Sequence, residues 1–211
     1  MIRRSTSVSA LFIAVLLCVA APAAIQAADR APTGTQQVDA TPLNQNLLQN
    51  PGFETVGTGT AIPGWAVVGG VRVETFGTRS WPSPAYAQKW DGGLRYLTCA
   101  RGTGLVRQTV NFTGWGTRTN TLLARFNANV GGKIGHKARV AILITGADGQ
   151  QAYKEKVRVF ANSNHYVRAV TTLAVPIWAT SIQATIELLP ADGAARCRAV
   201  ADTLDLWVFP A

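Results

Sequence analysis

The sequence LLARFNANV, residues 122–130, alternates apolar and polar side chains with a period of two. Its even-numbered residues are all apolar, whereas Arg125, Asn127 and Asn129 are polar. Successive side chains of a β-strand point to opposite faces of a sheet, so a period of two is typical of a strand. The segment therefore predicts a strand with one face on a core and the other towards solvent.

The same alternation recurs along the chain, and turn-forming residues separate the runs. It is found at 138–144, 153–159 and 182–188, with the turns GADG at 146–149 and PADG at 190–193. No window of twelve residues has the 3.6-residue period of an amphipathic helix. Strands with one polar and one apolar face pack as two facing sheets. We predict an all-β fold, a two-sheet antiparallel β-sandwich of the jelly-roll kind.

The first 27 residues have the composition of a cleaved signal peptide. Arg3 and Arg4 precede the apolar segment 11–21, which is too short to cross a bilayer, and small residues follow it. We place the cleavage after Ala27, with Ala28 as the alternative site. No second long apolar run occurs, so no transmembrane segment is expected. The protein is predicted to be secreted, periplasmic or on the cell surface.

The remaining chain is basic and long enough for one domain. The sequence has 20 Lys and Arg against 11 Asp and Glu, so loss of Arg3 and Arg4 leaves 18 − 11 = +7. Residues 28–44 are small and polar and predict a flexible lead-in, and 45–211 form the sandwich domain. The charge favours an anionic envelope polymer or acidic polysaccharide, or serves solubility alone. Scattered basic residues, with no run of five, argue against nucleic acid.

Two cysteines, Cys99 and Cys197, remain after the signal peptide. In an exported protein such a pair most often forms a disulfide. No CxxC pattern or neighbouring histidine supports a metal site or a catalytic thiol instead.

The opening of the domain carries a recognisable pattern. Asn50–Glu54 reads NPGFE, and PGW follows at 63–65. Later come VRQTV at 106–110 and the closing ADTLDL at 201–206. In this order the segments resemble the galactose-binding-like jelly-roll domains, which include many carbohydrate-binding modules. The resemblance covers roughly 45–209 and implies a jelly-roll fold with a binding function.

The resemblance also implies a structural calcium ion. In that family a Glu of the opening segment and an Asp of the closing strand often hold it with backbone carbonyls, and these positions are Glu54 and Asp202 here. The second acid of the closing pair is Thr203 in this chain, which is a departure from the pattern. The alternative is that Glu54 accepts from turn amides and that Asp202 pairs with Arg196 or Arg198.

Motifs of catalysis are scarce. His136 and His165 are the only histidines and have no metal-binding spacing, and no GxSxG elbow or phosphate loop occurs. A glycosidase needs two carboxyls facing one bond, and the pair Glu74 and Asp91 stays open from sequence alone. We expect no enzymatic activity.

Aromatic residues gather in one loop region, SWPSPAYAQKWDGG. Trp81, Tyr86 and Trp90 are predicted to form a ligand-binding patch, because flat rings suit the apolar faces of sugars. The alternative is that they only cap the sandwich. Trp65 and Trp207 are expected in the core. A rival site is the polar face of one strand, with Arg125, Asn127 and Asn129, together with Gln183 on another strand.

The sequence therefore predicts an exported, non-catalytic domain that binds carbohydrate or a cell-envelope polymer. The alternative function is a structural or adhesive domain that contacts protein and has no sugar site.

Overall fold

The computed structural model describes residues 35–38, 43–79, 81–112 and 121–211. The predicted signal peptide at 1–27 and the remainder of the lead-in lie outside these residues. Within the predicted lead-in, however, Thr35–Val38 form strand β1, which pairs in parallel with the end of β3. These four residues are therefore part of the sheet, whereas the sequence predicts a flexible segment.

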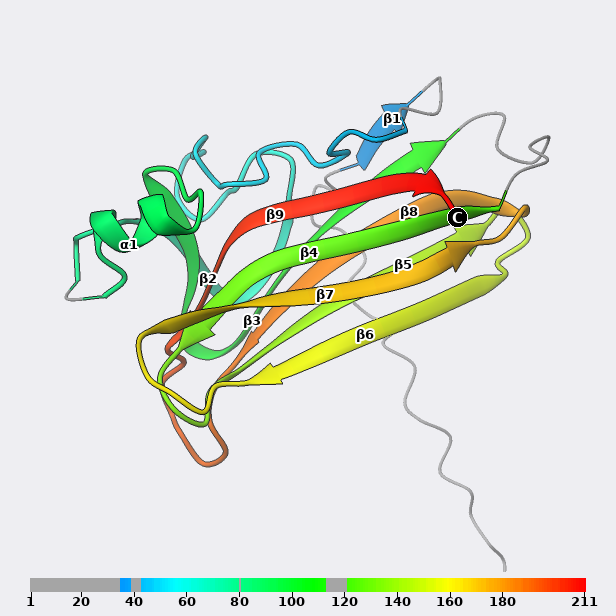
Figure 1. Cartoon of the computed structure of the whole chain (residues 1–211). Helices are drawn as coiled ribbons and strands as arrows, with labels where there is room; N and C mark the ends of the chain where they lie inside the picture. Colours follow the sequence, from blue (N-terminus) through cyan, green and yellow to red (C-terminus); the bar gives the residue numbers. More distant parts are fainter. Residues whose placement is uncertain (1–34, 39–42, 80, 113–120) are drawn as a thin grey trace, which may run out of the picture.

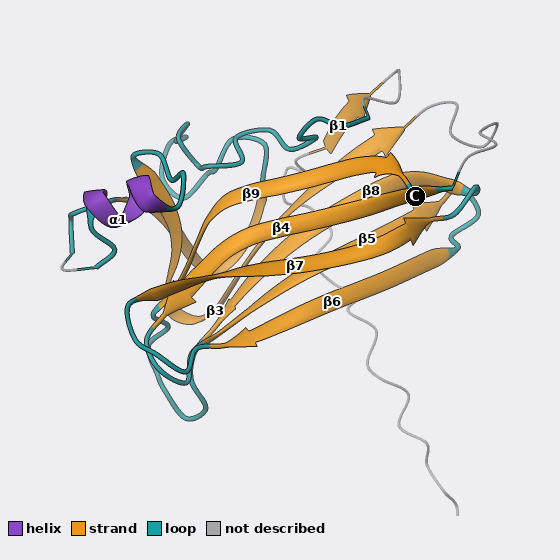
Figure 2. Ribbon diagram, in the orientation of Figure 1, coloured by secondary structure: helices purple, strands orange, loops and turns teal. Residues whose placement is uncertain are grey.

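Strands make up nearly all of the regular structure (Figures 1 and 2). The elements after β1 are β2 (Ala66–Thr75), α1 (Pro84–Lys89), β3 (Arg95–Phe112), β4 (Leu122–Gly132), β5 (Lys137–Gly146), β6 (Gln151–Val159), β7 (His165–Val175), β8 (Ala179–Leu189) and β9 (Ala199–Pro210).

The strands follow one hydrogen-bonded path, β6-β5-β8-β3-β9-β4-β7, which folds over into two facing layers. β3 belongs to both layers, because residues 104–111 pair with β8 whereas Leu97 and Thr98 pair with β9. β5 faces β4 and β7 across the core, and β8 faces β9. The predicted antiparallel sandwich is confirmed, with β1–β3 as a parallel pair.

Local sequence explains the hairpin between β5 and β6. The Gly146 amide donates to the Gln150 carbonyl at 2.9 Å, and Gly149 has φ +82°, which favours glycine. The turn predicted at 146–149 is thus confirmed. The alternation predicted for residues 182–188 is also present, since every even-numbered residue there is fully buried.

The NPGFE segment lies beside the closing strand. Phe53 is fully buried and packs on Trp65, with ring centroids 5.6 Å apart. The Leu204 amide donates to the Pro51 carbonyl at 3.2 Å. The two ends of the domain are therefore joined by backbone contact as well as by the core.

Gln108 ties β3 to the same opening segment. Its side chain is 1% exposed, accepts from the Gln49 amide at 2.7 Å, and donates to the carbonyls of Gln49 and Gly64 at 3.0 and 2.7 Å. A buried amide is tolerated only with its partners in place, and here all three bonds reach backbone groups. The residue fixes the approach of residues 49–64 to the sheet.

The disulfide between Cys99 and Cys197 is confirmed, with Cα atoms 5.3 Å apart. It links β3 to the segment that enters β9, and both sulfur-bearing residues are buried. In the described part of the chain, no helix has the length and apolarity to cross a bilayer.

Candidate functional site

A loop that contains α1 covers one end of the outer face of the β9-β4-β7 layer (Figure 1). The helix begins after Ser83, whose hydroxyl accepts from the Tyr86 amide at 3.2 Å, and Pro84 suits the first helical position. The Trp90 carbonyl accepts from the Asn129 side chain at 3.0 Å, which fastens the loop to β4. Thr203 Oγ1 also donates to the Trp90 carbonyl, at 3.3 Å, so local capping and long-range bonds together hold the loop in place.

The loop brings the three predicted binding residues together around Tyr166 of β7. The Tyr166 ring lies 5.4 Å from Trp81, 5.4 Å from Tyr86 and 6.2 Å from Trp90, measured between centroids. The Tyr86 hydroxyl accepts from the Tyr166 amide at 2.8 Å. We call these four residues the aromatic cluster; the sequence predicted three of them.

Tyr166 was missed because it stands far from the other three in sequence. It is 1% exposed, whereas Trp81, Tyr86 and Trp90 are half-buried. In the sequence, Tyr166 stands next to His165 at the start of a strand, and this position does not predict contact with a ligand.

The aromatic cluster also has a packing role. Together with Phe76 and Tyr96 it forms a second, smaller core outside the main one. Burial raises the pKa of Tyr166 well above its ordinary value, and the charge of Asp202 adds to the effect. The indole nitrogens of Trp81 and Trp90 are buried without a hydrogen-bond partner among the described residues. The capping interpretation is therefore compatible with the packing, and only the exposed parts of the rings can meet a ligand.

A pocket of about 100 Å³ opens beside Trp81 and is lined by residues of β3, β4 and β9 and of the loops next to them. Six of its lining residues provide aromatic, basic or amide groups: Arg79, Trp81, Tyr96, Lys133, Asn164 and Arg198. The lining includes no carboxylate. The sequence did not predict this pocket.

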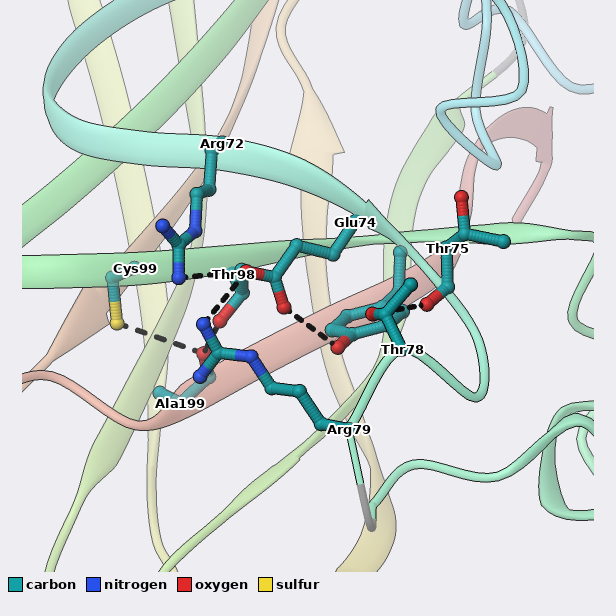
Figure 3. Close-up of polar contacts among 9 residues, drawn as sticks. Arg72, Glu74, Thr75, Thr78, Arg79, Thr98, Cys99 and Ala199 are labelled. Carbon is teal, nitrogen blue, oxygen red and sulfur yellow. Dashed lines mark hydrogen bonds and ion pairs between the residues drawn. The ribbon is translucent and has the colours of Figure 1, made fainter.

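Arg79 is held at the rim by Glu74. Figure 3 shows the Glu74 carboxylate between Arg72 and Arg79, with nitrogen–oxygen distances of 2.6 and 2.8 Å. The Tyr96 hydroxyl donates to the same carboxylate at 2.9 Å. Burial and this bond raise the pKa of Tyr96, so its hydroxyl stays protonated. Glu74 is thus engaged by three partners, and Asp91 is not one of them.

Glu54 and Asp202 approach each other at the covered end of the sheet. A Cβ at Gly52 would lie 3.9 Å from Glu54 Oε1 and 4.0 Å from Asp202 Oδ1, so both carboxylates border Gly52. Gly92 leaves the space for Asp202, since a Cβ there would come within 2.6 Å of Oδ2. Gly93 likewise leaves space for the Glu54 carboxylate, because a Cβ at this position would clash with Glu54 Oε1.

The partners of these two carboxylates differ. Glu54 Oε1 accepts from the Leu94 and Arg95 amides at 2.9 and 3.0 Å, as the alternative interpretation predicted. Asp202 accepts from the Thr203 amide at 2.7 Å and makes no ion pair within the described residues, so its predicted pairing with arginine is wrong.

Burial raises the pKa of Asp202 to about 7. The hydrogen bond from the Thr203 amide lowers this pKa, and the negative charge of Glu54 raises it further. A divalent cation would remove that cost, and carboxylate oxygens are the ligands that calcium prefers. No third His, Cys, Asp or Glu joins the two among the described residues. The residues present therefore fit a calcium ion only if carbonyl oxygens complete its coordination.

The rival site does not come together as one surface. Arg125, Asn127 and Asn129 share the outer face of β4, but the loop covers Asn129, and Gln183 lies on β8 in the other layer. Trp207 stands opposite Arg125 on this outer face and is half-buried, so its predicted core position is wrong. Trp65, in contrast, is 4% exposed, as predicted.

Neither histidine is placed for catalysis. His136 is buried, and its Nδ1 accepts from the amides of Ala191 and Arg198 at 3.3 and 3.2 Å. Burial lowers its pKa, and the charge of Arg198 adds to the effect. His165 is exposed, with its Nδ1 3.4 Å from the Tyr86 hydroxyl.

Comparisons with known proteins rest on structure, because the sequence matches no family model and no curated relative. One similar structure is the carbohydrate-binding module TmCBM61 in complex with β-1,4-galactotriose, at 17% identity and a TM-score of 0.50, covering 79% of this chain and 99% of that one. A cyclase from Fischerella sp. TAU is 14% identical with a TM-score of 0.53, covering 79% and 98%.

A xylan-binding CBM22-1 domain from Paenibacillus barcinonensis Xyn10C is 12% identical with a TM-score of 0.45, covering 76% and 92%. Of the first two neighbours, one is a binding module and the other is an enzyme. The structural similarity therefore supports the fold and does not identify an activity. The chain has the jelly-roll β-sandwich fold of the carbohydrate-binding modules, as its NPGFE opening implied.

Proposed function

We propose that this protein binds carbohydrate at the end of the sandwich that carries the aromatic cluster. The observation that carries the proposal is the convergence of the half-buried Trp81, Tyr86 and Trp90 beside a polar pocket. Aromatic faces stack on the apolar faces of sugar rings, and nearby polar groups bond the hydroxyls. The galactotriose bound to the neighbour TmCBM61 supports a galactan as the first probe.

The experiment is binding of the protein without residues 1–27 to soluble β-1,4-galactan and to a panel of polysaccharides. We expect Trp81→Ala and Trp90→Ala each to weaken binding about tenfold or more, the size of a hot-spot loss. Trp178→Ala is the matched control, because Trp178 lies at the opposite end of the sandwich, beside Gly146. Unchanged affinity in both variants, with folding verified by circular dichroism, contradicts the proposal.

We further propose that binding is not followed by a chemical step. Glu74, the carboxylate beside the pocket, is engaged by Arg72, Arg79 and Tyr96, which disfavours a role in proton transfer. Incubation with each retained polysaccharide is expected to release no new reducing ends. A time-dependent release, lost in Glu74→Gln, would overturn this part of the proposal.

Export of the protein is part of the same proposal. The disulfide between Cys99 and Cys197 suits an oxidising compartment, and a signal peptide is predicted at 1–27. We propose that the protein is secreted, periplasmic or on the cell surface, where envelope polymers and polysaccharides are within reach. Amino-terminal sequencing of the mature protein is expected to begin at residue 28 or 29.

A structural calcium ion between Glu54 and Asp202 is part of the proposal. The support is a buried carboxylate without a cation partner among the described residues, beside a second carboxylate, in a space lined by Gly92 and Gly93. Chelation is expected to lower the melting temperature of the wild type and to leave Asp202→Asn unchanged. No bound calcium on equilibrium dialysis, with no shift on chelation, contradicts the ion.

Contact with protein is the second candidate function, and the outer face of β6 favours it. Tyr153, Val157 and Val159 are 55%, 38% and 60% exposed on one face of this terminal strand. If no polysaccharide binds, and Val157→Lys abolishes retention of a partner protein, this function replaces the first.

A further inference from the structure

Basic side chains gather around the pocket beside Trp81. The positive net charge of the chain does not by itself require this clustering. Arg79, Lys133 and Arg198 reach it from three different elements, namely the loop after β2, the end of β4 and the approach to β9. Like charges repel, so three cations around one small space have a cost that scattered surface placement avoids. The arrangement calls for an anionic occupant.

Two of these three cations have no counter-charge. Within the described residues, neither Lys133 nor Arg198 lies within ion-pair distance of a carboxylate. Arg79 shares Glu74 with Arg72, so that group of three carries a net charge of +1. The positive charge of Arg198 also helps to lower the pKa of buried His136.

Backbone contacts hold the elements around the pocket in fixed relation. The Lys133 amide donates to the Arg198 carbonyl at 3.2 Å, and the Asn164 amide donates to the Gly132 carbonyl at 2.9 Å. A Cβ at Gly132 would come within 2.5 Å of the Arg198 carbonyl oxygen, so only glycine allows this approach. The cations are therefore attached to a preorganised backbone, which lowers the entropic cost of binding.

The pocket has room for a charged group of a ligand. Its volume of about 100 Å³ is enough to accept a carboxylate or a sulfate beside the three basic side chains. Trp81 lines the same pocket and belongs to the aromatic cluster, so a sugar ring stacked on the cluster can direct a substituent inwards.

We propose that this pocket is a subsite for the oxyanion of an acidic sugar, either the carboxylate of a uronic acid or a sulfate ester. Arg79, Lys133 and Arg198 supply the charge, and the Asn164 side chain supplies a neutral donor. The inference rests on the proposed function, since the sugar ring is to be held by the aromatic cluster. It narrows the substrate class to anionic polysaccharides.

The test measures affinity of the protein without residues 1–27 at 0.15 M salt for paired polymers. Polygalacturonate is compared with its methyl-esterified form, and dextran sulfate with dextran. We expect at least a tenfold preference for one anionic member, and the pair that shows it identifies carboxylate or sulfate. The double variant Lys133→Ala/Arg198→Ala is expected to lose that preference.

The control is Arg101→Ala/Lys154→Ala, which removes the same charge from exposed positions on β3 and β6. An equal loss in the control means that only net charge attracts the polymer, and this overturns the subsite. Binding of neutral galactan that needs Trp81 but shows no anionic preference also overturns the subsite, while the proposed function stands. If no polymer of either kind binds, both fail.

Discussion

At Gly92 the fold has room for a hydrogen atom but not for a methyl group. A Cβ there would lie 2.6 Å from Asp202 Oδ2 and 3.1 Å from the Ala87 carbonyl oxygen. We expect Gly92→Ala to lower the free energy of unfolding by roughly 1–3 kcal/mol, as overpacking does. Gly52→Ala is the control, because its Cβ meets nothing closer than 3.7 Å. Equal unfolding midpoints in urea for the two variants would contradict the crowding at Gly92.

His136 predicts one component of the pH dependence of stability. Its pKa is lowered in the folded state, by burial and then by Arg198, so the unfolded chain binds a proton more readily. The stabilisation from neutral His136 is therefore complete above pH ~6.5 and is lost as the pH falls below it. The raised pKa of Asp202 acts in the opposite direction over the same range, because its protonated carboxyl stabilises the fold at lower pH. The contribution of His136 is therefore measured as a difference between the wild type and a His136 variant, by urea titration at pH 5.5 and 8.

The matched variants are His136→Asn and His165→Asn. The difference between wild type and His136→Asn is expected to shrink at pH 5.5, because the variant has no imidazole to protonate. His165 is exposed, and its replacement should leave the pH dependence as it is. If the difference in unfolding free energy between wild type and His136→Asn were the same at both pH values, protonation of His136 would not contribute to the pH dependence of stability.

Two tryptophans show which single residues could be placed from sequence. Trp65 follows Pro63 and Gly64 in the PGW segment, and it is buried as predicted. Trp207 lies in an alternating strand, where the apolar face is normally inward, yet it faces outwards opposite Arg125. Leu204, Leu206 and Val208 are fully buried and alternate with Asp205, so the period of this strand places Trp207 on the outer face. Here the period of the strand is a better guide than the large apolar side chain of Trp207.

At the scale of elements, β6 shows how a terminal strand is kept from pairing with another chain. Lys156 stands opposite Val140, which is fully buried, so this lysine projects from the inner side of the strand. Inward-pointing charges on edge strands oppose edge-to-edge association. The outer face carries Tyr153 and Val157 instead.

We expect Lys156→Val to promote self-association, because it removes the charge from the open edge and adds a β-branched apolar residue. Light scattering at increasing concentration should report larger species than for the wild type. Arg101→Val, which removes one positive charge from an exposed position of β3, should behave as the wild type does. If both variants scatter alike, Lys156 has no protective role.

The elements of the candidate site were predictable only where they are local. The loop with Trp81, Tyr86 and Trp90 is one sequence segment rich in proline and glycine, and its clustering was predicted. Tyr166 and the pocket were not, because Lys133, Asn164 and Arg198 come from separate segments whose meeting depends on the order of strands. Strand order is set by long-range pairing, and no local pattern records it.

At the scale of the whole molecule, the disulfide between Cys99 and Cys197 closes a long covalent loop. Cys99 and Cys197 are 98 residues apart. In the chain-entropy model a cross-link of this span stabilises the fold by roughly 4–5 kcal/mol. The double variant Cys99→Ser/Cys197→Ser is expected to lose most of that, as measured by urea unfolding without reductant. Equal urea midpoints for the variant and the wild type would show that the disulfide does not stabilise the fold.

The claim at the centre of this account is that sugar binds at the aromatic cluster. The six tryptophans give separate indole N–H signals in a nitrogen-15 correlation spectrum, and each can be assigned with a Trp→Phe variant. Titration with an oligosaccharide of the retained polymer is predicted to shift the signals of Trp81 and Trp90 and to leave Trp65 and Trp178 in place. Shifts confined to Trp207, or to none of the six, would contradict it.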